Sequence, residues 1–156
     1  MHRPTTLLLL TVFVCSFSHR CVADEPVTLM GKLSPWMYPK ASMGGAQMSD
    51  AATIDGSGNR TVPSIACKTT MKTNDSVEKV IAFYKEKLGP AKDADSKEQA
   101  ERKEGRSVLI SDESDGRPFA LHTILVNTAS TSTTLIISRG ASEKQTHIIW
   151  KHYARL

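Results

Sequence analysis

The sequence predicts an α+β fold, in which one long helix packs on an antiparallel sheet of about four to five strands. Two observations predict it. One segment has the caps and the apolar spacing of an amphipathic helix, and the segments after it are rich in β-branched residues and separated by short turns. Because a helix and a sheet each have one apolar face to bury, packing one on the other is the simplest arrangement.

The helix is predicted over residues 76–88. Asp75 and Glu78 match a capping box at its start, and Gly89 followed by Pro90 is typical of a helix end. Between these signals, apolar residues recur at helical spacing and form a single stripe: Val77, Val80, Ile81, Tyr84 and Leu88.

Strand-like composition precedes and follows this helix. Residues 61–72 predict one strand before it, and four segments predict strands after it: 107–112, 118–127, 133–139 and 145–153. The separators between these four are short and contain turn residues, which predicts antiparallel hairpins.

The residues before 61 carry weaker signals. We expect a short strand at 27–30, a docked aromatic segment between the prolines of 35–39, and a long loop over 40–60. The resulting element order resembles that of the cystatins, although their Gln-x-Val-x-Gly loop does not occur in this chain. The resemblance therefore implies no inhibition of proteases.

The first 23 residues have the pattern of a secretory signal peptide. Arg3 makes the start positive, an apolar run extends from Leu7 to Phe17, and small residues precede Asp24. The run is shorter than the about 20 apolar residues that a transmembrane helix needs. We expect cleavage near Ala23, with cleavage after Ser18 as the alternative, and a periplasmic or extracellular location.

The predicted cleavage near Ala23 divides the chain into three parts. Residues 1–23 are the signal peptide, 24–60 an extended or loop N-terminal segment, and 61–156 a single α+β domain. No later segment reaches the length of a transmembrane helix, so the mature chain is expected to have none.

The net charge and the cysteine count limit the classes of partner and the covalent links that we expect. The chain has 20 Lys and Arg against 16 Asp and Glu, a net charge of +4. Removing Arg3 and Arg20 with the signal leaves 18 basic and 16 acidic residues, or +2. This near balance argues against a nucleic-acid partner. Cys67 is the only cysteine after residue 23, so no internal disulfide can form, and a buried inert thiol is expected.

Part of the chain resembles a group of uncharacterised exported bacterial proteins. In that group a Thr-x-Asp-Ser start, Thr73 to Ser76 here, leads into a helix ending in Phe-Tyr-x-x-x-Leu, Phe83 to Leu88 here. Residues 134–138 are also similar, and so are residues 38–41, where Lys40 replaces the usual glycine of Tyr-Pro-Gly-Ala. The resemblance covers about residues 60–155. It implies an exported α+β domain and carries over no activity or site residue.

The candidate binding residues lie on or beside the last predicted strand. Aromatic rings stack on sugars or lie at a headgroup boundary, and positive groups attract anions. We therefore expect a cell-envelope polymer, a lipid headgroup or an envelope protein as the partner. The alternative is an edge strand that its charges protect against aggregation. The residues are Lys144, His147, Trp150, Lys151, His152, Tyr153 and Arg155.

No motif indicates a catalytic residue, a metal or a cofactor. His147 and His152 are five residues apart, which on a strand places them on opposite faces, while His122 could meet His152 across strands. Four methionines carry the soft sulfur that Cu(I) prefers, but their spacing is irregular, so we expect packing or loop positions rather than a copper site. They are Met30, Met37, Met43 and Met48.

The sequence thus predicts an exported, non-enzymatic domain with a binding or accessory role in the periplasm or cell envelope. A small extracytoplasmic enzyme with site residues scattered along the chain is the alternative. A concave pocket holding a His or Cys with a shifted pKa would favour the enzyme.

Overall fold

A computed structural model describes residues 26–89 and 105–156 of the chain. The predicted signal peptide and its cleavage site near Ala23 lie outside these residues. Within them, no helix is long and apolar enough to cross a membrane.

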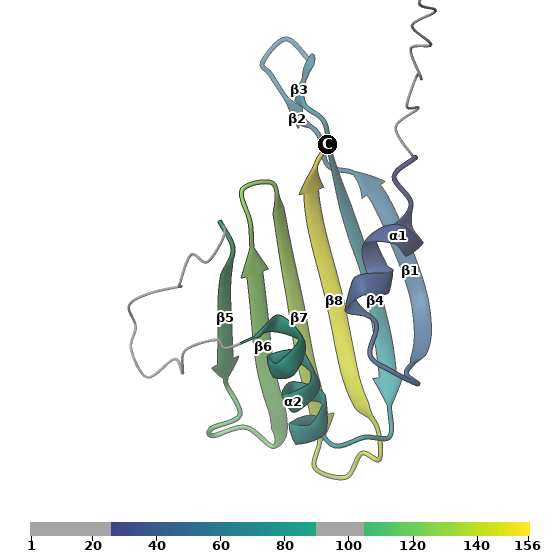
Figure 1. The fold of residues 1–156 in the computed structure, drawn as a ribbon, viewed down its shortest axis with the longest axis vertical. Helices are drawn as coiled ribbons and strands as arrows, with labels where there is room; N and C mark the ends of the chain where they lie inside the picture. The colour runs from purple at the N-terminus through teal and green to yellow at the C-terminus, as the bar shows by residue number, and fades with distance from the viewer. Residues whose placement is uncertain (1–25, 90–104) are drawn as a thin grey trace, which may run out of the picture.

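The architecture is one six-stranded antiparallel sheet with a small two-stranded ribbon at one end (Figure 1). The order across the large sheet is β1-β4-β8-β7-β6-β5, and β2 pairs with β3 in the ribbon. The strands are β1 (Ser42–Asp50), β2 (Thr53–Ile54), β3 (Arg60–Val62), β4 (Ser64–Thr73), β5 (Ser107–Asp112), β6 (Phe119–Asn127), β7 (Thr131–Gly140) and β8 (Thr146–Arg155).

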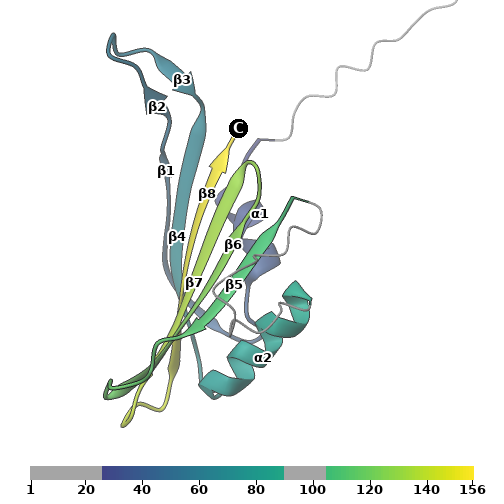
Figure 2. The ribbon, with the colours of Figure 1, turned by 90° about the vertical axis from the view of Figure 1, so that its left-hand side faces the viewer.

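The helices all lie on the same side of this sheet (Figure 2). They are α1 (Leu29–Leu33), the 3₁₀ turn η1 (Ser34–Trp36) and α2 (Val77–Leu88). The core fills the space between them and the sheet, and its largest fully buried side chains include Trp150, Tyr84 and Leu33. We call the covered side of the sheet the helix face and the other side the open face.

The predicted fold class is therefore wrong. The protein is mainly antiparallel sheet, with eight strands rather than four to five, and it has no long helix: α2 contains 12 residues and α1 with η1 only 8 (5 + 3). One reason is that β1, an edge strand in the stretch expected to be a loop, is exposed along nearly its whole length. Such a strand needs no apolar alternation, so composition does not reveal it.

The predicted helix is confirmed in position and in the face it buries. All five residues of its apolar stripe are buried. The cap is one residue later than expected: the Ser76 hydroxyl accepts a hydrogen bond from the Lys79 amide. Gly89 follows the last residue with a φ of 73°, a conformation that glycine adopts at little cost.

The N-terminal aromatic segment is docked, as expected, and the structure shows that it packs on α2. The Tyr84 hydroxyl donates to the carbonyl of Trp36 at 2.8 Å, and the Tyr38 ring meets Phe83 edge to face. The strand predicted at 27–30 is wrong, because α1 begins there with Thr28 as its cap. A short apolar run does not distinguish strand from helix by itself.

Tyr38 also ties this segment to the start of α2. Its buried hydroxyl donates to Asp75 at 2.8 Å, and the same carboxylate accepts from Lys79. Burial and the neighbouring carboxylate raise the pKa of Tyr38 to about 12. The hydrogen bonds from Lys79 and Tyr38 lower the pKa of Asp75. The residues of the Thr-x-Asp-Ser and Tyr-Pro-x-Ala segments therefore meet in one structural cluster.

Candidate functional site

The last strand alternates strictly between the two faces of the sheet. Its helix-face residues are buried: Thr146, Ile148, Trp150, His152 and Ala154. Its open-face residues are half-buried or exposed: His147, Ile149, Lys151, Tyr153 and Arg155. The expectation that His147 and His152 lie on opposite faces is confirmed.

This alternation divides the candidate residues. His147, Lys151, Tyr153 and Arg155 lie together on the open face, and Lys144 lies in the turn before β8. Trp150 and His152 point into the core, where Trp150 is 0% exposed. The structure therefore brings four of the seven residues to one surface.

The edge-strand alternative is wrong. β8 lies inside the sheet, hydrogen-bonded to β4 on one side and to β7 on the other. Charges that protect an edge against aggregation are needed only on strands with a free side. The positive residues of β8 therefore need another explanation.

Two lysines face each other in the middle of the open face. Lys68 on β4 is directly opposite Lys151 on β8, and both side chains are exposed. Side chains in such positions have Cβ atoms about 5 Å apart, and like charges there destabilise a sheet. Among the described residues neither ammonium has a carboxylate partner. Four register steps along, on the same face, Lys72 is opposite His147.

The open-face positions of the sheet strands carry no acidic residue. The row through the two lysines continues as Gln47 on β1 and Thr134 on β7. The next row contains Ser49, Ala66, Tyr153 and Ser132. In the β7–β8 turn, beyond the end of these strands, the Glu143 carboxylate lies 3.7 Å from the His147 ring.

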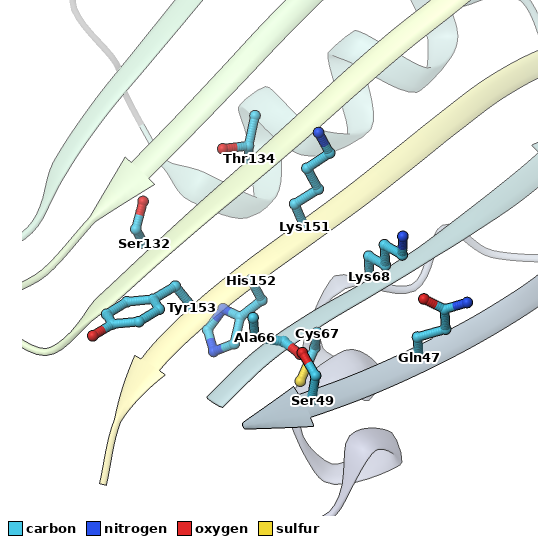
Figure 3. A pocket seen from close by; sticks show the side chains of 10 residues that line it. All are labelled: Gln47, Ser49, Ala66, Cys67, Lys68, Ser132, Thr134, Lys151, His152 and Tyr153. Carbon is cyan, nitrogen blue, oxygen red and sulfur yellow. The ribbon is translucent and has the colours of Figure 1, made fainter. Parts of the chain in front are cut away.

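A shallow depression of about 460 Å³ lies over these two rows (Figure 3). The small side chains Ala66, Ser49 and Ser132 line it together with Lys68 and Lys151. Cys67 and His152 line it as well. The Tyr153 hydroxyl donates to the Ser64 hydroxyl at 2.8 Å, which fixes the ring at the other end. The hollow therefore offers ammonium, hydroxyl and amide groups together.

Lys68 and Lys72 are functional candidates that the sequence reasoning missed. The signal was present, because residues two apart on a strand share a face and these lysines are four apart. The pairing of β4 with β8, which places Lys68 opposite Lys151, cannot be predicted from the sequence.

Beneath the same strands, the helix face holds a histidine and a thiol. Cys67 is directly opposite His152. The His152 Nδ1 shares a 2.7 Å hydrogen bond with the Thr133 hydroxyl, and its Nε2 has no partner among the described residues. Burial lowers the pKa of His152 and raises that of Cys67. His122 does not meet His152, because β7 separates their strands.

Among the described residues, no group of three or more His, Cys, Asp or Glu side chains could hold a metal ion. Comparison of the chain with family models, with curated proteins and with solved structures finds no match. The functional assignment therefore depends on the geometry of this chain alone.

Proposed function

We propose that this chain is an exported binding domain that holds an acidic polysaccharide on the open face of its sheet. The observation that carries the proposal is the pair Lys68 and Lys151, two exposed lysines directly opposite each other on interior strands. This arrangement opposes folding, because like charges face each other. Local features that cost stability are expected at functional sites.

The surroundings of the lysines favour a sugar polymer over a small ion. Hydroxyl groups of Ser49, Ser132 and Thr134 and the amide of Gln47 line the hollow. Such groups form hydrogen bonds with sugar hydroxyls, while the ammonium groups attract carboxylates or phosphates. The half-buried ring of Tyr153 provides an apolar surface for a sugar ring.

The shape of the face fits an extended ligand. The sheet is open along six strands, and no described helix lies on this side (Figure 2). Lys72, Lys68 and Arg155 follow the β4–β8 pair from one end to the other. A polymer lying along this pair can contact all of these charges, which a single small anion cannot.

The cellular setting is part of the proposal. The N-terminal pattern of residues 1–23 supports export. Acidic polymers of the cell envelope then become the accessible partners, in the periplasm or outside the cell.

Binding of the purified chain to polygalacturonate, compared with neutral dextran, tests the proposal. We expect binding to polygalacturonate alone, weakening as salt rises, since salt screens exposed charges beyond about 8–10 Å. Vesicles of phosphatidylglycerol form a second arm. Binding to these vesicles but not to the polysaccharide would replace the sugar polymer by a lipid headgroup.

A pair of matched double variants localises the site. Lys68→Gln with Lys151→Gln removes two charges from the open face, and Lys85→Gln with Lys87→Gln removes two from exposed positions of α2 on the other side. We expect only the first to lose binding. Equal loss in both would mean that net charge, rather than this site, determines the affinity.

A further inference from the structure

Three sulfur or nitrogen donors follow one another in a row across the helix face. Met48 on β1 is opposite Cys67 on β4, and Cys67 is opposite His152 on β8. Neighbouring members of such a row have Cβ atoms about 5 Å apart. A single ion above Cys67 is therefore within reach of all three side chains.

His152 contributes a free ring nitrogen to this row. The imidazole uses Nδ1 for Thr133, which lies on β7. The ring of His152 and the thiol of Cys67 lie beside each other on the neighbouring strands β8 and β4 (Figure 3). Nε2 is buried without a partner among the described residues, in a side chain that is only 8% exposed. Buried polar atoms normally have a partner, so this nitrogen is available to a ligand.

The orientation of the imidazole ring is fixed in the way that is typical of metal-binding histidines. Metal-binding histidines use their second ring nitrogen for an outer hydrogen bond that fixes tautomer and orientation. The Thr133 hydroxyl, itself 1% exposed, is positioned for this role. Trp150 stacks on the imidazole with the rings 5.5 Å apart and an angle of 6° between them, which fixes the ring plane.

From this arrangement we propose that Met48, Cys67 and His152 bind one Cu(I) ion. Cu(I) prefers soft donors such as thioether, thiolate and imidazole. A structural zinc site needs four Cys, His, Asp or Glu ligands, and the described residues bring no group of even three together. On binding, the Cys67 thiol loses its proton to solvent and the sulfur forms the bond to copper. Lys32 is close enough to act electrostatically on both Cys67 and His152. The thiolate neutralises the charge of the ion, so the bound ion adds no net positive charge beside this lysine.

The row also provides a path of entry. Met48 lies on the edge strand β1 and is 44% exposed, while Cys67 is 3% exposed. An ion first meets the thioether at the edge of the sheet and then reaches the two buried donors. The three side chains belong to the helix face, although Cys67 and His152 also border the hollow of the open face.

Anaerobic titration with Cu(I), in competition with the chelator bicinchoninate, tests the site. Cys15→Ser and Cys21→Ser are introduced first, because the sequence has three cysteines and only Cys67 belongs to the proposed site. We expect one Cu(I) per chain and sulfur in the copper X-ray absorption spectrum. A spectrum without sulfur, or no competition with the chelator, overturns the proposal.

Two exposed methionines of β1 provide a matched pair of variants. Met43 and Met48 are 43% and 44% exposed, so neither substitution disturbs the core. We expect Met48→Leu to bind Cu(I) more weakly and Met43→Leu to bind as the parent does. Thr133→Val is expected to weaken binding by about 10–100-fold, the usual effect of removing an outer-shell partner. Equal affinities for the two methionine variants, or unchanged binding after Cys67→Ser, overturn the site.

Discussion

Reversing one charge on the open face should separate stability from binding. In Lys151→Glu, a carboxylate replaces the ammonium group that faces Lys68 across the β4–β8 pair. A repulsive pair on the surface then becomes an attractive pair. The variant is therefore expected to fold at least as well as the parent while it loses the proposed ligand.

Both effects can be estimated from the structure. Opposite charges in directly opposed positions stabilise a sheet by about 0.2–1 kcal/mol, and glutamate and lysine are similarly poor strand formers. The local charge of the site changes by two. At about 1 kcal/mol for each charge near an anionic surface, binding weakens by about 2 kcal/mol. This corresponds to about a 30-fold increase in Kd.

Urea unfolding and binding to polygalacturonate measure the two effects separately. Lys85→Glu is the control, because it makes the same change in net charge on an exposed position of α2. We expect only Lys151→Glu to gain stability and to lose affinity. If the variant is less stable than the parent, the lysines do not repel each other as proposed; if its affinity is unchanged, Lys151 does not contact the ligand.

Three further predictions concern the core, the acid dependence of folding and processing. Ile81→Ala should lower the free energy of unfolding by about 2–5 kcal/mol, whereas Leu109→Ala, at a side chain 52% exposed, should change it little; similar urea midpoints would contradict the packing of α2. The hydrogen bond from Lys79 lowers the pKa of folded Asp75, so its contribution is present above its unfolded pKa of about 4 and is lost as pH falls through the folded value. Asp75→Asn should therefore lose less stability than the parent between pH 5 and about pH 2, and parallel curves would contradict this linkage. N-terminal sequencing of exported protein should begin at Asp24, and an intact Met1 would refute cleavage.

Local patterns were sufficient to predict α2 and the last four strands. The stripe of α2 is set by contacts within one segment, and the hairpins of β5 to β8 are set by short turns, so a window of sequence contains both signals. The strand β1 is different. Its residues include Gly44 and Gly45 and have no apolar alternation, and its existence depends on pairing with β4. Strand preference depends strongly on such neighbours, which local composition does not contain.

The sequence predicts only part of the candidate site, because alternation along β8 is a local signal and strand pairing is not. Alternation along β8 separates Lys151 and Tyr153 from Trp150 and His152, but both faces contain apolar groups, so the sequence does not say which one is buried. The partners of β8 are contributed by distant segments. The opposed Lys68 and the thiol of Cys67 become neighbours of β8 only through the register of β4.

The location of the ligand on the open face is tested most directly by NMR. Amide chemical shifts of the chain are recorded while a galacturonic acid oligomer is added. We predict that the shifted amides lie on β4, β8 and β7 around Lys68, Lys151 and Ser132, and that those of α2 stay unchanged. Shifts confined to α2 and the N-terminal segment, or no shifts at concentrations where the polymer is bound, would contradict the account.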